Sequence, residues 1–319
     1  MHFFDVVGAG RIGHGIALCV AMHGFHTRLR DVKQRPEGEE EKIRETAFRN
    51  IREALRLFIE EQAVQETADA IINRISFVKG YEGLEEAFHV VEAVPENIET
   101  KKTVYHQLCQ HITEDTLIAS TSSSIRPSTI AQFVKTPSRF LVTHWINPAE
   151  IIPLVEVAPS PMTSSETIEE AVDFLRRCGK TPVVCGDSPG YVSARLQAAL
   201  MNEALRIIGE GVASPEAVDA ALMAGIGFRL GVHGLMEFLD WGGVDILHKV
   251  DEYLAEALQA ERFKPPPMLR KLVEEGRLGM DRGRGVYDYG GVDVDKLRLS
   301  RKKMMIRRLK EINALGILR

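Results

Sequence analysis

Hydrophobic residues follow two alternating periods along the first half of this chain. Short apolar runs that suit buried strands lie at residues 4–7, 25–31, 90–94, 116–119, 139–143 and 182–184. Between several of them, apolar positions recur at helical spacing, most clearly over 39–62, 98–108 and 166–178. Strands that alternate with helices are typical of a parallel sheet covered by helices on both faces. The pattern therefore predicts a doubly wound α/β domain.

The pattern changes at the sequence Asp-Ser-Pro-Gly over 187–190. From Tyr191 onward almost every segment has helical period, including a charged stretch over 294–312. We place the domain boundary near Ser188. The sequence then predicts an α/β domain with a parallel doubly wound sheet over 1–188 and an all-α domain over 189–319.

Composition narrows the class of protein. The chain has 319 residues, of which 45% are hydrophobic and 27% charged, and a net charge of −5. Nucleic-acid binding normally requires a basic surface, so this mildly acidic chain is a poor candidate for it. No apolar run approaches the ~20 residues of a membrane span. The four cysteines form no CxxC pair, so no zinc site or disulfide framework is indicated. With no leader-like segment before the first strand, we expect a cytoplasmic protein without nucleic-acid or membrane partners.

A glycine-rich turn follows the first predicted strand. It reads Gly8-Ala9-Gly10-Arg11-Ile12-Gly13 and opens a helix. In such a turn the first glycine permits the tight bend, the second lets the backbone approach a pyrophosphate, and the third lets helix pack on strand. Arg11 and Ile12 belong to the same predicted cofactor-binding turn.

Asp31 completes this unit at the end of the next predicted strand, eighteen residues after Gly13. Its carboxylate can accept hydrogen bonds from both ribose hydroxyls and would repel a 2′-phosphate. We therefore expect a Rossmann-type domain that binds NAD in preference to NADP. Lys33 and Arg35 lie just beyond Asp31 and could weaken that preference.

A second group of candidate residues lies around His144 and Glu156. A neutral histidine suits the removal of a hydroxyl proton near pH 7. Glu156 stands inside the apolar run Leu154-Val155-Glu156-Val157, where a charge is costly unless it is paired. A buried carboxylate can hold an imidazole in one tautomer and stabilise its protonated form. We predict that the two side chains form an acid–base pair.

Several motifs together resemble the L-3-hydroxyacyl-CoA dehydrogenase family. Besides the glycine turn, they are Val91-Glu92-Ala93-Val94-Pro95-Glu96-Asn97, Ser122-Ser123-Ser124, His144-Trp145-Ile146-Asn147-Pro148, Pro153-Leu154-Val155-Glu156-Val157 and, near the end, Gly283-Arg284-Gly285-Val286-Tyr287. The resemblance covers nearly the whole chain. It implies oxidation of an L-3-hydroxy group to a 3-keto group with hydride transfer to NAD, and a homodimer formed through the C-terminal domain.

The resemblance also implies roles for particular residues. His144 would be the general acid and base, with Glu156 as its orienting partner and Asn147 behind it. Ser123 would hydrogen-bond the substrate oxygen. Glu96 and Lys101 would lie near the nicotinamide end of the cofactor.

Two features depart from the family pattern. Ala194 stands where the family usually has an asparagine that contributes to the substrate site, and Ser193 beside it points about 100° away on a helix. The helix over 45–65, where acyl-CoA enzymes tend to carry lysines, has only Arg49, Arg52 and Arg56, and Glu39-Glu40-Glu41 precede it. A phosphate-rich ligand would prefer cations there.

Two alternatives therefore stay open beside an acyl-CoA substrate. The first is a dehydrogenase of a small hydroxy acid or alcohol without CoA. The run from Ile151 to Glu156 also resembles the L-gulonate (lambda-crystallin) and carnitine branches, and the pattern His-Trp-x-Asn-Pro from His144 also occurs in a relative that acts on a pyridine carboxylate. The second is a crystallin-like protein that binds NAD without turnover. The intact set of Ser123, His144, Glu156 and Asn147 argues against the second.

Overall fold

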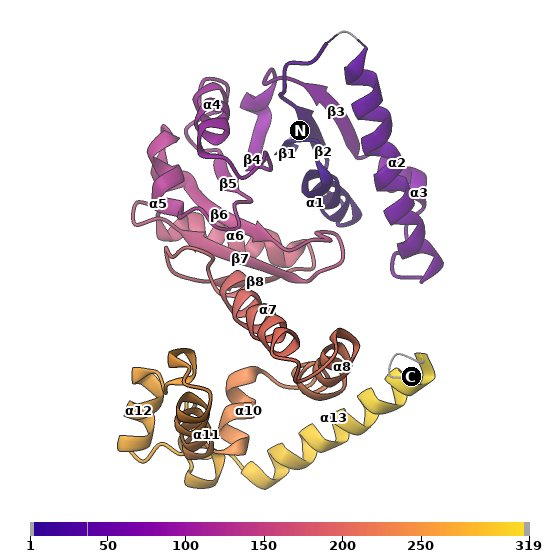
Figure 1. The fold of residues 1–319 in the computed structure, drawn as a ribbon. Coiled ribbons are helices and arrows are strands. Elements are labelled where there is room, and N and C mark those ends of the chain that lie inside the picture. Colours follow the sequence, from indigo (N-terminus) through magenta and orange to yellow (C-terminus); the bar gives the residue numbers. More distant parts are fainter. Residues whose placement is uncertain (1–2, 37, 316–319) are drawn as a thin grey trace. The chain divides into compact units, whose positions relative to one another are not determined.

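The computed structural model describes residues 3–36 and 38–315 (Figure 1). The chain divides into two compact units, Met1–Leu200 and Met201–Arg319. This division lies within one helix, a little after the boundary expected near Ser188.

The first unit is built on one eight-stranded sheet with the order β3-β2-β1-β4-β5-β6-β7-β8. Its strands are β1 (Phe3–Val7), β2 (Thr27–Asp31), β3 (Ile75–Lys79), β4 (Ala87–Glu92), β5 (Leu117–Ser120), β6 (Phe140–Trp145), β7 (Leu154–Pro159) and β8 (Thr181–Val184). Neighbouring strands are parallel except β6 and β7, which pair antiparallel. The expected α/β sheet is confirmed, with β3 and the antiparallel β7 as strands that the apolar pattern did not predict.

Helices lie on both faces of this sheet (Figure 1). They are α1 (Arg11–Met22), α2 (Glu39–Glu60), α3 (Ala68–Ile72), α4 (Ile98–Leu108), α5 (Pro127–Ile130) and α6 (Ser165–Arg177). The first unit also includes the first half of α7 (Ser193–Gly209). Successive residues of a strand point to opposite faces. Accordingly Val6 packs in the hydrophobic cluster that contains residues of α1 and α6, while Val7 packs in the cluster that contains residues of α4.

The second unit is helical. After the end of α7 it contains α8 (Pro215–Ala221), a π-helical segment (Leu222–Gly227), α9 (Phe228–Leu230), α10 (Leu235–Gly242), α11 (Val244–Ala257), α12 (Pro267–Glu274) and α13 (Val294–Leu315). The all-α character expected for this part is confirmed, and so is the charged terminal helix. Within the described ranges no single helix is long and apolar enough to cross a membrane; a pair bent by 92°, Pro215–Leu230 with Leu235–Gly242, passes that test only when joined.

His89 introduces a pH dependence into the core of the first unit. It lies on β4, is 2% exposed, and its ring centroid is 5.0 Å from that of Phe4 and 5.1 Å from that of Phe174. Its Nε2 has no hydrogen-bond partner among the described residues. Burial first, and then the charge of Arg139, lowers the pKa of His89 to about 3. The folded protein therefore holds this side chain neutral.

We expect His89→Phe to remove part of the acid sensitivity of folding. Because the pKa in the folded state is depressed, the unfolded chain binds more protons between pH 3 and pH 6.5, and stability falls as pH decreases through that window. Between pH 7 and pH 5 this group lowers the free energy of unfolding by about 2 kcal/mol. Denaturant unfolding at pH 7 and pH 5 measures it. The exposed His106, replaced by glutamine, is the control, and an equal pH dependence in both variants would contradict the assignment.

Candidate active site

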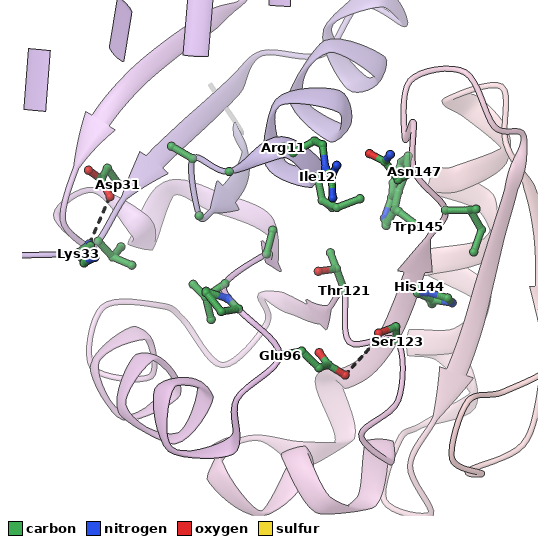
Figure 2. Close-up of a pocket in the computed structure, with 18 of the residues that line it drawn as sticks. Arg11, Ile12, Asp31, Lys33, Glu96, Thr121, Ser123, His144, Trp145 and Asn147 are labelled. Carbon is green, nitrogen blue, oxygen red and sulfur yellow. Dashed lines mark hydrogen bonds between the residues drawn. The ribbon is translucent and has the colours of Figure 1, made fainter. Parts of the chain in front are cut away.

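A cavity of about 800 Å³ opens at the carboxyl edge of the sheet (Figure 2). The chain segments that follow β1, β4 and β5 line it, together with the last residue of β2, because the carboxyl ends of parallel strands meet at one edge. From the set predicted by sequence, the lining contains Gly8, Gly10, Arg11, Ile12, Asp31, Glu96, Ser123, His144 and Asn147. The fold therefore brings most of the predicted cofactor and catalytic residues to one cavity.

The glycine turn has the geometry that a pyrophosphate requires. Gly8 has φ +127°, and a Cβ there would come within 2.5 Å of the Ala93 carbonyl oxygen. A Cβ at Gly13 would lie 2.0 Å from the Gly8 carbonyl oxygen, so only glycine lets α1 approach β1. At Gly10 the position of a Cβ is open, with no atom within 4 Å. The turn therefore leaves a free approach to the N-terminus of α1, whose N–H groups favour an anion.

Asp31 lies at the end of β2 and is 5% exposed. Its carboxylate stands at the far end of the cavity from His144 (Figure 2). The lining thus runs from a candidate ribose acceptor, past the glycine turn, to the acid–base candidate. This order of groups fits a dinucleotide laid along the edge of the sheet.

His144 and Glu156 form the expected pair. They occupy directly opposite positions of the antiparallel strands β6 and β7, where facing side chains are neighbours. His144 Nδ1 is 2.7 Å from Glu156 Oε2, and Glu156 is fully buried. With Nδ1 bound to the carboxylate, Nε2 is the ring nitrogen left to exchange a proton with a substrate.

Glu156 also holds the start of α7. The backbone N–H groups of Val192 and Ser193 donate to Oε1 at 2.9 and 2.7 Å, and the Ser193 hydroxyl donates to Oε2 at 2.6 Å. Burial acts to raise the pKa of Glu156, but the hydrogen bonds from Ser193, His144 and the backbone outweigh it and the pKa is lowered. The carboxylate therefore stays ionised beside the imidazole.

Ser193 was missed by the sequence reasoning. Because Ser193 is next to Ala194 on a helix, its side chain was expected to point away from the substrate site. Both residues nevertheless line the cavity, and the Ser193 hydroxyl donates to the Glu156 carboxylate. The contact arises because Ser193 is the first residue of α7, where Glu156 receives its backbone N–H. An apolar-embedded glutamate that needs partners was the only sequence signal for it.

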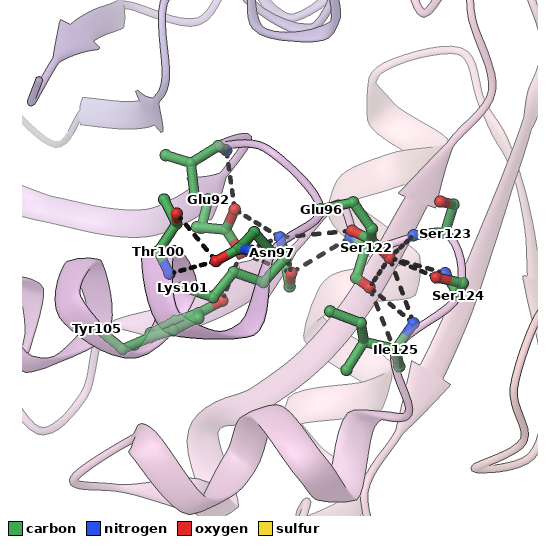
Figure 3. A network of polar contacts seen from close by, with 12 residues as sticks. Glu92, Glu96, Asn97, Thr100, Lys101, Tyr105, Ser122, Ser123, Ser124 and Ile125 are labelled. Carbon is green, nitrogen blue, oxygen red and sulfur yellow. Dashed lines mark hydrogen bonds and ion pairs between the residues drawn. The ribbon is translucent and has the colours of Figure 1, made fainter.

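Glu96 organises the turn that carries Ser123 (Figure 3). Its Oε1 accepts hydrogen bonds from the Ser122 hydroxyl at 2.6 Å, from the Ser123 N–H at 3.1 Å, and from the N–H and hydroxyl of Ser124, both at 2.9 Å. Burial acts to raise the pKa of Glu96, but these hydrogen bonds and the charge of Lys101 lower it. The exposed Ser123 is thereby held at the cavity by its backbone, with its own hydroxyl free of Glu96.

Lys101 differs from the expectation that it lies against the cofactor. Its side chain is fully buried and is not part of the cavity lining. Its ammonium donates to both oxygens of the buried Glu92, at 2.8 and 2.9 Å, and lies 3.7 Å from Glu96 Oε2 (Figure 3). A buried carboxylate needs such a partner. In the structure Lys101 therefore supports the segment that carries Glu96.

Comparisons with known proteins agree with this geometry. Residues 4–188 match the model of the 3-hydroxyacyl-CoA dehydrogenase NAD-binding domain, and residues 190–289 match that of the C-terminal domain. A probable 3-hydroxybutyryl-CoA dehydrogenase of Bacillus subtilis is 36% identical over 284 residues, which cover 89% of this chain and 96% of that protein.

Solved structures give the same result. A 3-hydroxyacyl-CoA dehydrogenase of Archaeoglobus fulgidus is similar with a TM-score of 0.77 and 30% identity over 100% of both chains. An NAD⁺-dependent 5-dehydrogenase of a formyl-hydroxy-methylpyridine carboxylic acid has a TM-score of 0.72 and 29% identity over 98% of this chain and 99% of that one. The chain belongs to the 3-hydroxyacyl-CoA dehydrogenase family of NAD-dependent oxidoreductases that act on a CH–OH group.

Proposed function

We propose that this protein oxidises the hydroxyl group of a 3-hydroxyacyl-CoA to the 3-keto group. The observation that carries the proposal is the 2.7 Å contact between His144 and the buried Glu156 on the cavity that also holds the glycine turn and Asp31. Relatives that are 33–36% identical bear the names 3-hydroxybutyryl-CoA and hydroxyacyl-coenzyme A dehydrogenase.

The residues of this chain divide the work along the cavity. Gly10 and the N-terminus of α1 would hold the pyrophosphate of NAD, and Asp31 the adenosine ribose. NAD supplies the acceptor for the hydride that leaves the substrate carbon. His144 Nε2 takes the hydroxyl proton, and Ser123 hydrogen-bonds the same oxygen. Glu156 keeps the proton of the free imidazole on Nδ1 and stabilises the positive charge that the ring acquires.

A dehydrogenase of a small hydroxy acid without CoA is the second candidate. Ala194 lines the cavity in place of the hydrogen-bonding asparagine that is usual in the family. On α2, Arg56, one of the three arginines over 45–65, lies 3.4 Å from Glu60 and is thus paired with a carboxylate. Both observations weaken the case for a phosphate-rich substrate. The pyridine-carboxylate enzyme with a TM-score of 0.72 supports the same alternative.

A substrate panel separates these candidates. NADH formation is measured with 3-hydroxybutyryl-CoA, free 3-hydroxybutyrate, L-gulonate, carnitine and a pyridine methanol carboxylate. We expect kcat/KM for the CoA ester to exceed the others by at least about tenfold, an increment of roughly 1.4 kcal/mol in transition-state binding. Faster turnover of a free acid would replace the proposal by the second candidate. Tight NADH binding with no turnover of any alcohol would indicate a binding protein.

Two further expectations concern the whole molecule. We propose that the second unit forms a homodimer, because it exposes large apolar side chains, among them Leu205 (67%), Ile246 (53%) and Tyr253 (70%). Light scattering coupled to size exclusion tests this, and a monomer at micromolar concentration would contradict it. The cytoplasmic location stays a prediction.

A further inference from the structure

The carboxylate of Asp31 is held by an arginine four residues further along the chain. Arg35 Nε donates to Oδ2 of Asp31, and Arg35 Nη2 donates to Oδ1 at 3.1 Å. The backbone N–H of Lys33 donates to Oδ1 at 3.3 Å. All three residues line the cofactor cavity. The acid that should receive the adenosine ribose is therefore already engaged by a bidentate guanidinium.

This engagement limits what Asp31 can offer a ribose. A carboxylate has about four lone-pair sites for hydrogen bonds, and three donors occupy three of these sites here. A ribose with free 2′- and 3′-hydroxyls asks the same carboxylate for two acceptor sites. Binding of NAD through both hydroxyls therefore has to loosen at least one bond from Arg35. Arg35 competes with the cofactor that Asp31 favours.

The charges around Asp31 act in the same direction. An aspartate excludes a 2′-phosphate when its negative charge is uncompensated, whereas here the adjacent guanidinium neutralises it. Arg35 is also the side chain best suited to bind a phosphate by two parallel hydrogen bonds. Lys79, which stands beside Asp31 in the β2–β3 register, donates to Glu40 at 2.7 Å and is thus already paired. Lys33 also lines the cavity, but Arg35 is the cationic side chain that contacts the Asp31 carboxylate.

We propose that Arg35 sets the cofactor selectivity of this protein by narrowing its preference for NAD over NADP. It does so in two ways, by occupying the Asp31 oxygens that the NAD ribose needs and by offering a cation to the 2′-phosphate of NADP. The proposal concerns the cofactor site only, so it holds or fails independently of the hydroxyl substrate.

Equilibrium binding of NADH and NADPH to the full chain, followed by nicotinamide fluorescence, tests the proposal. For Arg35→Ala we expect the Kd of NADPH to rise about tenfold or more, while the Kd of NADH falls or stays within about twofold. Arg35→Lys, which keeps the charge and loses the bidentate geometry, should lie between the wild type and Arg35→Ala for NADPH. The control is Arg44→Ala, which removes an exposed arginine of α2 that pairs with Glu41.

The outcomes are distinct. A rise in the NADPH Kd with little change for NADH supports the proposal. An unchanged NADPH Kd, or an equal loss for both cofactors, overturns it. Circular dichroism of each variant identifies a folding defect, and Arg35→Lys then carries the comparison. Because no turnover is measured, failure of the proposed CoA substrate would leave the result intact.

Discussion

Replacing His144 with glutamine is expected to lower kcat by roughly 10²–10⁴ while NADH still binds. Glutamine can fill the space and accept a hydrogen bond, but it cannot take a proton from a hydroxyl group. In the part of the chain that the structure describes, no hydrogen bond joins His144 to the glycine turn or to Asp31, so the cofactor end of the cavity should keep its geometry. Steady-state kinetics with the best substrate of the panel measures the change.

Two controls make this result specific. The NADH Kd of the variant should stay within about twofold of the wild type, which separates lost proton transfer from lost binding. His111→Gln changes a histidine that stacks on Tyr81, 5.8 Å between ring centroids, outside the cavity lining. Its kcat should be unaffected. A His144→Gln enzyme with nearly wild-type kcat would remove His144 from the mechanism.

The part of the site that the sequence predicted well is the part that is local in the chain. The unit from β1 through the glycine turn and α1 to β2 spans about thirty residues, and Gly8 and Gly13 meet steric demands that a motif can reveal. The pairing of His144 with Glu156 was also predictable, because a glutamate within the apolar run Leu154-Val155-Glu156-Val157 requires a partner.

The parts that were missed depend on contacts between distant segments. β3 is an edge strand in which only Ile75 is buried, and its sequence Ile-Ser-Phe-Val-Lys lacks the continuous apolar run of the central strands. β7 runs antiparallel to β6, and the hydrophobic periodicity of a sequence does not indicate the direction of a strand. Lys101 was expected at the cofactor because the motif places it near Glu96, whereas the buried Glu92 on β4 binds its ammonium. Ser193 is likewise positioned by a distant residue, because its N–H and hydroxyl both donate to the Glu156 carboxylate.

Glu156→Gln is expected to reduce kcat as strongly as the His144 variant, and for a reason specific to this site. The backbone N–H groups of Val192 and Ser193 both donate to Oε1, so a glutamine must place its carbonyl oxygen there. Its NH₂ group then occupies the position of Oε2, 2.7 Å from His144 Nδ1. An NH₂ group can only donate, which makes Nδ1 an acceptor and moves the ring proton to Nε2. The nitrogen that has to take the substrate proton is then already protonated.

We therefore expect a loss of roughly 10²–10⁴ in kcat, because the wrong tautomer faces the substrate and the imidazolium loses its counter-charge. Ser193→Ala is the matched variant: it deletes the hydroxyl that donates to Oε2 but keeps the carboxylate and both backbone hydrogen bonds. Its kcat should fall by less than about tenfold. Denaturant unfolding of both variants checks that the start of α7 persists. An equal loss of kcat in Ser193→Ala and Glu156→Gln, at equal stability, would contradict a role of the histidine tautomer. Both variants would then act through the position of α7 and not through the charge beside His144.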